Sequence, residues 1–465
     1  MIRIEDLGAK SSHETSLSTF QSLSTKYNGL IELSPYKKMR NLLFELMRYI
    51  YSSMTSNSGS LQAVLRVTNK IMMWIRFFQL FGPSLYVNFV ISGKDNFSLW
   101  SQDNPISRII EYLSVLWNLI PPRNRDDLCH IILIIYTVLF ILFFLIIVGS
   151  SFYYKRYANL PDFIPPIIMF FINTFGFFMH PVSIAHGFQI IGYYINNSSD
   201  RSNLVLNIVL IVLSFLCFAI YLWLYIHIFA ISIEFRDDSL LCILFMPQVQ
   251  ILTCTTIITA IAAIFTHFQT IPKCVGCFIN AGIYVFLFVN RLIEGGFVNH
   301  IANILFGTLT LSGAAVSVLC AILLIMKHQL NTSFIFVIIA FTVIMAIVVN
   351  FYESYRRSKI LALLDDFATY SDFNIFPTVR LFMSAIIIGF EKAHPMCVNY
   401  SIFNEAIKKW EDDTRVWCCF LKFLAIYSEF SNESALAAQH ITNAKLKGYL
   451  IKNMLHQSSA LLKSR

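Results

Sequence analysis

Residues 130–148 read His130-Ile-Ile-Leu-Ile-Ile-Tyr-Thr-Val-Leu-Phe-Ile-Leu-Phe-Phe-Leu-Ile-Ile-Val148, an apolar run without a single Asp, Glu, Lys or Arg. A helix of about 20 such residues spans the hydrocarbon core of a bilayer, where every backbone group must find its partner inside the protein. The run therefore predicts a membrane-spanning α-helix, and all-α is the expected fold class.

Similar runs predict a polytopic bundle of about eight transmembrane helices between residues 71 and 352. Arg76 interrupts the first of them, and we expect its long side chain to reach the membrane interface. Pro181 predicts a kink in the third, where a neighbouring helix must satisfy the freed carbonyl. Gly313 and Ser317 are small residues four apart and favour a close helix contact. The expected spans are residues 71–91, 130–148, 166–193, 204–233, 251–268, 275–292, 301–326 and 334–351.

The composition supports this interpretation. Of the 465 residues, 56% are hydrophobic and 13% are charged, whereas soluble chains carry about 25% charged residues. Phe alone occurs 43 times, and its ring leaves no polar atom to satisfy in lipid. We therefore expect the lipid bilayer as the main partner and no nucleic-acid partner.

The amino-terminal region is expected to be polar and partly disordered. Residues 1–33 are rich in Ser and contain no secretory signal, so the first span would act as its own insertion signal. Residues 34–70 predict amphipathic or juxtamembrane helices. Their basic and apolar residues fit a helix lying on an anionic membrane face, and they fit a helix packed on another domain equally well.

The loops predict that both termini are cytoplasmic. With eight spans, this orientation places the basic pair Lys155 and Arg156 on the cytoplasmic side, together with the later cluster of Arg356, Arg357 and Lys359. It places three candidate glycosylation sites on the opposite side, as glycosylation requires. These sites are Asn96, Asn196 and Asn331. If the first span did not cross, the amino terminus would lie outside.

Polar residues inside spans are the candidates for an intramembrane site. They are His180, His186 and His227, and a histidine bonded to a neighbouring helix is the simpler interpretation. No expected span interior contains Asp or Glu. A polar cavity lined by Asn173, His180, Thr255 and Thr259 would favour transport, whereas a solid aromatic bundle would favour anchoring and signalling. Cys274 and Cys277 form a CxxC pair without the further ligands that a zinc site needs.

Residues 353–465 differ from the bundle, because their apolar runs shorten and their charges return. Apolar positions recur three and four apart, as at Trp417 and Phe420, which predicts about five amphipathic helices. We interpret them as a cytoplasmic tail that resembles tetratricopeptide repeats or as five unrelated helices in a small bundle. The helix with Trp417 and Phe420 is the candidate partner-binding element.

The layout resembles a known family. The chain has a Ser-rich start, then Pro35-Tyr-Lys-Lys-Met-Arg-Asn-Leu-Leu-Phe44, then Phe-rich spans, then Trp417-Cys-Cys-Phe-Leu-Lys-Phe-Leu-Ala-Ile-Tyr427. This resembles the membrane region of a family of trichomonad and ciliate protozoa that is similar to the tiny macrocysts proteins. Many members carry a PAS sensor and a nucleotide cyclase domain. Nothing after Tyr355 predicts the strands of a cyclase, so the resemblance implies a member without that domain or a truncated product.

Three classes of function follow. The first is a receptor-like or scaffolding membrane module, with a protein partner bound by the tail and homo-oligomerisation as a further option. The second is a transporter or channel for an uncharged or weakly charged solute. The third is a lipid-modifying enzyme, ranked last because the sequence contains no catalytic motif. We expect no enzyme activity, no cofactor and no metal.

Overall fold

The computed structural model describes most of the bundle and part of the tail. The described residues are 38–50 except 41, 44 and 48, then 60–85, 99–100, 105–121, 125–196, 203–229, 246–294, 297, 299–392, 394–398, 400–411, 413, 415–417 and 419–420. The predicted disordered segment 1–33 and residues 421–465 of the tail lie outside them. The fold is all-α: within the described ranges the one β-type contact is a single bridge between Trp100 and Leu330.

Six of the described helices are long and apolar enough to cross a membrane, which makes the chain plausibly an integral, multi-pass membrane protein with the lipid bilayer around it. The apolar runs fold as helices because lipid offers no partner for open backbone groups. The six helices are α6 (Arg125–Tyr157), α9 (Leu204–Leu224), α11 (Met246–Ile264), α12 (Thr270–Glu294), α13 (His300–Ile325) and α14 (Thr332–Tyr370).

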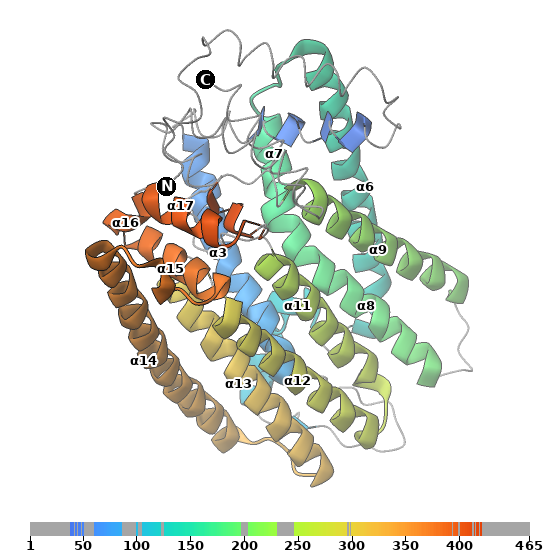
Figure 1. Cartoon of the computed structure of the whole chain (residues 1–465). Coiled ribbons are helices and arrows are strands. Elements are labelled where there is room, and N and C mark those ends of the chain that lie inside the picture. The colour runs from blue at the N-terminus through green and yellow to red at the C-terminus, as the bar shows by residue number, and fades with distance from the viewer. Residues whose placement is uncertain are drawn as a thin grey trace.

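These helices form one bundle, in which α3 (Ser60–Phe81) packs against α13 and α8 (Gly176–Asn196) and exposes Ile71, Trp74 and Phe78 on another face (Figure 1). One side of the bundle consists of α6, α9 and α8, and α8 packs along α11. The other side is the series α12, α13 and α14, with α14 at the edge. Outward-facing Phe, Ile, Leu and Val side chains on α6, α9 and α14 are exposed, as expected for helices that face lipid.

The predicted third span is a helix in three parts. α7 (Ile164–Phe170) leads into the π-helical turn η4 (Phe171–Phe175), which continues as α8. Pro181 lies inside α8, as predicted, and removes the hydrogen bond to the carbonyl four residues earlier. On the next carbonyl, that of Phe178, the side chain of Gln79 donates a hydrogen bond of 2.8 Å from α3. Another helix thus supplies a donor beside the proline.

Arg76 has an aromatic partner within the bundle. Its guanidinium lies 3.9 Å from the centroid of the Phe177 ring on α8. A cation over an aromatic face is stabilised where water is scarce. Arg76 and Gln79 stand one turn apart on α3, so the polar face of this helix is turned toward α8.

α3 ends inside the bundle and continues as the 3-10 helix η2 (Gly82–Leu85). Four carbonyls around this break receive side-chain hydrogen bonds. Tyr284 donates to Leu80, and Ser84 donates to Phe81 at 2.7 Å. The Cys320 thiol lies 3.6 Å from the carbonyl of Ser84, and the Trp100 indole donates to Leu85 at 2.9 Å. The break is thus satisfied within the protein, as its location among apolar helices requires.

Close contact between α12 and α13 depends on a small residue. A Cβ atom added to Gly313 would lie 2.9 Å from the ring of Tyr284, too close for an unperturbed contact. Further along the same interface, the Cys274 thiol reaches the carbonyl of Ala321 at 3.6 Å. Ser317 is buried between these points. Gly313 therefore allows the close approach that its spacing from Ser317 predicts.

A helix within residues 38–50 packs against the bundle. Its apolar face, formed by Leu43, Leu46, Met47 and Ile50, is buried in the same core as residues of α6 and α8. Tyr49 places its ring 4.8 Å from that of Tyr154 and donates a hydrogen bond to Asn159, just after α6. The sequence allowed this helix to lie on a membrane face or to pack on another domain. Its apolar face packs on the bundle.

Beyond the apolar part of α14, a second core forms. It joins the distal half of α14 to η7 (Phe373–Ile375), α15 (Val379–Glu391), α16 (Pro395–Val398) and α17 (Tyr400–Lys409). We call this the distal unit. Its separate helices have 13, 4 and 10 residues. Whether the tail is a tetratricopeptide-like repeat or a small bundle stays a prediction.

Candidate functional site

His180 occupies the centre of an aromatic cluster. Its side chain is completely buried, and Nδ1 is hydrogen-bonded to the hydroxyl of Tyr136 on α6. The rings of Phe140, Phe218 and Tyr221 stand around it, with centroids 5.9, 5.4 and 4.1 Å from the imidazole. Among the residues that the structure describes, none forms a hydrogen bond with Nε2. An imidazole in this environment can hold a single tyrosine hydroxyl in place.

The same cluster stabilises the π-helical turn η4. A π-type turn shifts the backbone hydrogen bonds, and the hydroxyl of Tyr221 donates a 2.8 Å bond to the carbonyl of Ile172 within it. Gly176 makes this contact feasible, because a Cβ atom there would overlap the Tyr221 ring. The phenol ring thus lies directly on the backbone of the helix that carries His180.

His186 forms a separate pair of contacts. Nδ1 lies 3.2 Å from the thiol of Cys129, and Nε2 lies 2.8 Å from the carbonyl of Asn118. His186 therefore connects α8 to α6 and to α5 (Val115–Asn118). His180 and His186 point to different partners and do not converge on one ligand. His227 falls in the π-helical turn η5 (Tyr225–Phe229), and its side chain lies outside the described residues.

The candidate cavity residues are packed into helix contacts. Thr255 and Thr259 are 4% and 3% exposed. The hydroxyl of Thr259 donates to the carbonyls of Thr255 and Thr256, both at 2.9 Å. The side chain of Asn173 lies outside the described residues. Around His180 the neighbours are aromatic rings, which is the arrangement expected of a solid bundle.

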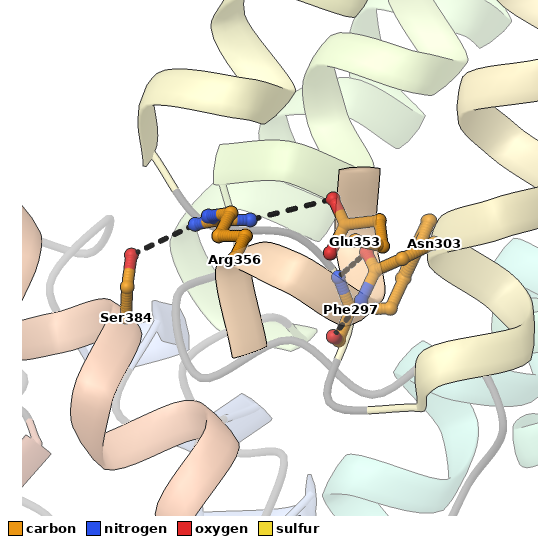
Figure 2. A network of polar contacts seen from close by, with 5 residues as sticks. All are labelled: Phe297, Asn303, Glu353, Arg356 and Ser384. Atoms are coloured by element: carbon orange, nitrogen blue, oxygen red, sulfur yellow. Dashed lines mark hydrogen bonds and ion pairs between the residues drawn. The ribbon is translucent and has the colours of Figure 1, made fainter. Parts of the chain in front are cut away.

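Sequence reasoning missed the junction between the bundle and the distal unit. Arg356 on α14 forms an ion pair of 3.5 Å with Glu353, one turn earlier, and donates a hydrogen bond of 3.1 Å to Ser384 on α15 (Figure 2). The side chains of Arg356 and Glu353 are 15% and 8% exposed. A charged pair so well shielded is costly to break on one side only.

The basic cluster predicted for the cytoplasmic side is thus divided between two roles. Arg356 and Arg357 are half-buried and buried, whereas Lys359 is exposed. The sequence pattern R-R-S-K carries the positive charge but does not indicate which side chains turn inward. The signal available was Glu353, three residues before Arg356 at helical ion-pair spacing.

Figure 2 also draws the start of α13 near this junction. The Asn303 side chain accepts a hydrogen bond of 2.7 Å from the backbone nitrogen of Phe297 and donates one of 2.6 Å to its carbonyl. Asn299 caps the helix by accepting from the nitrogens of Ile301 and Ala302. These bonds fix the chain where it enters α13.

Trp417 and Phe420 lie inside the distal unit. Both are 2% exposed and belong to its core, and the Trp417 indole donates a 2.7 Å bond to the carbonyl of Glu411. The helix predicted to bind a partner therefore turns these two side chains toward its own core. Any surface it offers a partner comes from other residues.

The candidate glycosylation sites are placed in part. Asn196 ends α8 and hydrogen-bonds through its side chain to the carbonyl of His267. Asn331 is exposed and caps α14, accepting from the nitrogen of Phe334 at 3.4 Å. Asn96 lies outside the described residues.

The chain matches no protein-family model, no curated protein and no solved structure. Within the described residues, no group of three or more His, Cys, Asp or Glu side chains is arranged to hold a metal ion. The function must therefore be argued from the arrangement of the chain itself.

Proposed function

We propose that this chain is a receptor-like or scaffolding membrane module that presents the distal unit to a cytoplasmic protein partner. One observation carries the proposal: α14 is a single helix of 39 residues whose first half is apolar and exposed and whose second half belongs to the core of the distal unit. At 1.5 Å per residue it is about 58 Å long, far more than a bilayer core requires. Bundle and unit are thus joined by a rigid element.

The proposed module crosses the membrane eight times. The two crossings added to the six apolar helices are α3 with η2 and α7 with η4 and α8. Both are less apolar than the six helices, and both have neighbours that support burial in a bundle. The Gln79 side chain of α3 donates a hydrogen bond to the carbonyl of Phe178 in α8, and the Tyr284 hydroxyl in the middle of α12 donates one to the carbonyl of Leu80. Polar groups in spans are tolerated when they face other helices.

An even number of crossings places both termini on one side, and the charges favour the cytoplasm. The amino-terminal helix and the distal unit lie at the same end of the bundle (Figure 1). Lys155, Arg156 and Lys359 are exposed at that end. Positive residues near span ends mark the cytoplasmic face. Asn196 and Asn331 fall on the opposite side in this arrangement.

Anchoring is preferred to transport because of the packing around His180. Four aromatic side chains fill the position where a polar path would pass, and Thr259 bonds to its own helix. We assign no reaction to this chain. Its place in the protozoan family that the sequence resembles is part of the proposal, and a partner cyclase or kinase would fit it.

Co-purification from native membranes tests this proposal with one pair of variants. Trp417→Ala removes a buried indole and should destabilise the distal unit by about 3–5 kcal/mol. We expect the variant to insert into membranes normally and to lose the signalling enzyme that the wild-type chain retains. Lys408→Ala is the matched control, because that side chain is exposed.

Two results would overturn the proposal. One is a Trp417→Ala chain that still retains the same partners although protease accessibility shows that its distal unit is unfolded. The other is flux of a solute through vesicles that contain only the purified chain, since a solid anchoring bundle conducts nothing.

A further inference from the structure

The exposed face of α14 changes from aromatic to basic where the apolar stretch ends. Phe351, Tyr352 and Tyr355 are 71%, 44% and 68% exposed. Lys359 follows Tyr355 by one turn and is also exposed. Residues three and four apart lie on one helix face, so Tyr352, Tyr355 and Lys359 form a single stripe. Aromatic rings and basic side chains in this order are typical of a membrane–water interface.

α6 repeats the pattern at its carboxyl end. Tyr153 and Tyr157 are 45% and 56% exposed, and Lys155 and Arg156 between them are exposed as well. The guanidinium of Arg156 lies 5.4 Å from the centroid of the Tyr157 ring. The side of α6 that faces out of the bundle therefore ends in the same combination of aromatic and basic groups.

Both stripes lie at the end of the bundle where the amino-terminal helix and the distal unit pack (Figure 1). The turn at the opposite end, between α13 and α14, differs. There the exposed apolar residues Ile325 and Met326 are followed by one basic residue, Lys327, without an aromatic neighbour in the helix end. The turn between α13 and α14 thus lacks the combination of exposed aromatic and basic groups that both stripes show.

We propose that these two stripes bind the headgroups of anionic phospholipids. Tyrosine hydroxyls sit at headgroup level, and each Lys or Arg near the surface is attracted to negatively charged lipid. The nearest exposed carboxylates on these elements are farther out: Asp162 follows α6, and Asp365 and Asp366 lie one to two turns beyond Lys359. Positive charge next to exposed apolar surface, with negative charge beyond it, matches a lipid leaflet better than an acidic protein.

This inference rests on the membrane-spanning arrangement of the proposed function but not on a partner protein. The test uses the purified full chain in phosphatidylcholine vesicles that carry a small fraction of spin-labelled phosphatidylserine or spin-labelled phosphatidylcholine. We expect the immobilised, protein-bound fraction to be larger for phosphatidylserine. Raising the salt concentration should reduce that preference.

Removing the charges identifies the residues. In the triple variant Lys155→Gln, Arg156→Gln, Lys359→Gln we expect the preference for phosphatidylserine to fall by up to about fivefold per charge removed. Lys327→Gln, at the opposite end, is the matched control and should leave it unchanged. All four side chains are exposed, so both variants should fold, which helix content by circular dichroism checks.

Three outcomes would overturn the proposal: no preference for phosphatidylserine in the wild-type chain, a preference that the triple variant retains, or an equal loss in Lys327→Gln. The first of these, combined with retained partners in native membranes, would make the stripes a contact for an acidic protein. If the wild-type chain kept its preference for phosphatidylserine but retained no partner in native membranes, the proposed function would be rejected and the lipid proposal would stand.

Discussion

At the scale of single residues, the chain depends on side chains that satisfy broken helices. Tyr284 is completely buried, and its hydroxyl caps the carbonyl of Leu80 where α3 gives way to η2. Because the surrounding atoms are apolar, this carbonyl has no water to replace the phenol. Leaving a buried carbonyl without a hydrogen-bond donor costs more free energy than an average hydrogen bond contributes to stability.

Tyr284→Phe removes only that hydroxyl. We expect it to destabilise the bundle by about 1–3 kcal/mol, the cost of an unsatisfied buried carbonyl. Reversible unfolding in mixed detergent micelles measures the difference. Tyr355→Phe is the control, because that ring is 68% exposed, and equal stability of the two variants would refute the role given to Tyr284.

Gly176 permits the phenol of Tyr221 to reach the backbone of η4. Gly176→Ala should destabilise the bundle by about 1–3 kcal/mol, because the new methyl group overlaps that ring. The control is Gly149→Ala on α6, where no atom lies within 4 Å of the new Cβ and alanine favours the helix. A midpoint of unfolding that Gly176→Ala leaves unchanged would mean that the ring can move aside.

The distal unit contains a titratable pair that predicts its response to acid. Asp413 accepts bonds of 3.0 and 2.6 Å from Arg415. Burial acts to raise the pKa of Asp413, but the hydrogen bonds and charge of Arg415 outweigh it and hold the pKa below its ordinary value of 3.8. The stabilising effect is therefore present above pH 3.8 and lost as the pH falls through the lower pKa of the folded state.

Asp413→Asn should thus be less stable than the wild type at neutral pH, and the difference should shrink toward zero in acid. Thermal unfolding followed by tryptophan fluorescence, across about pH 6 to pH 3, measures it. A difference that stays constant over this range would show that the carboxylate charge does not matter.

At the scale of elements, hydrophobic length was the reliable guide. The runs around residues 130–148, 204–224 and 301–325 are helices because each is apolar for the width of a bilayer. The close contact at Gly313 was also predictable, since it follows from the size and spacing of local residues. Boundaries were less so: α3 begins at Ser60, well before residue 71.

What the sequence did not indicate depends on partners distant in the chain. The π-helical turn at Phe171–Phe175 is fixed by Tyr221, and nothing in the local residues predicts it. Arg356 was assigned to the cytoplasmic side with its basic neighbours, and the pattern did not indicate that Ser384 and Glu353 hold it at a helix junction. His180 was found as a candidate, but its aromatic surroundings come from two other helices, α6 and α9.

At the scale of the whole molecule, the arrangement predicts that both ends face the same compartment. Protease added to sealed, right-side-out vesicles should leave the distal unit intact, and permeabilisation should expose it. An epitope between residues 327 and 331 should be accessible from outside. Cleavage of the distal unit from outside, with the 327–331 epitope protected, would invert the topology.

The length of α14 has a mechanical consequence. About 19 of its residues extend beyond the apolar stretch, so this lever arm is roughly 28 Å long. Transmembrane helices tilt to match bilayer thickness, and a change of about 10° would swing the far end by roughly 5 Å. Arg356 holds α15 to this part of α14 by a hydrogen bond near the membrane, so the distal unit would move together with the helix.

Spin labels on α17 and on the amino-terminal helix would measure this displacement in short-chain and long-chain phosphatidylcholine. An unchanged distance between the labels would mean that the bundle resists the change of tilt. A module of this shape could then report the thickness of the membrane that surrounds it.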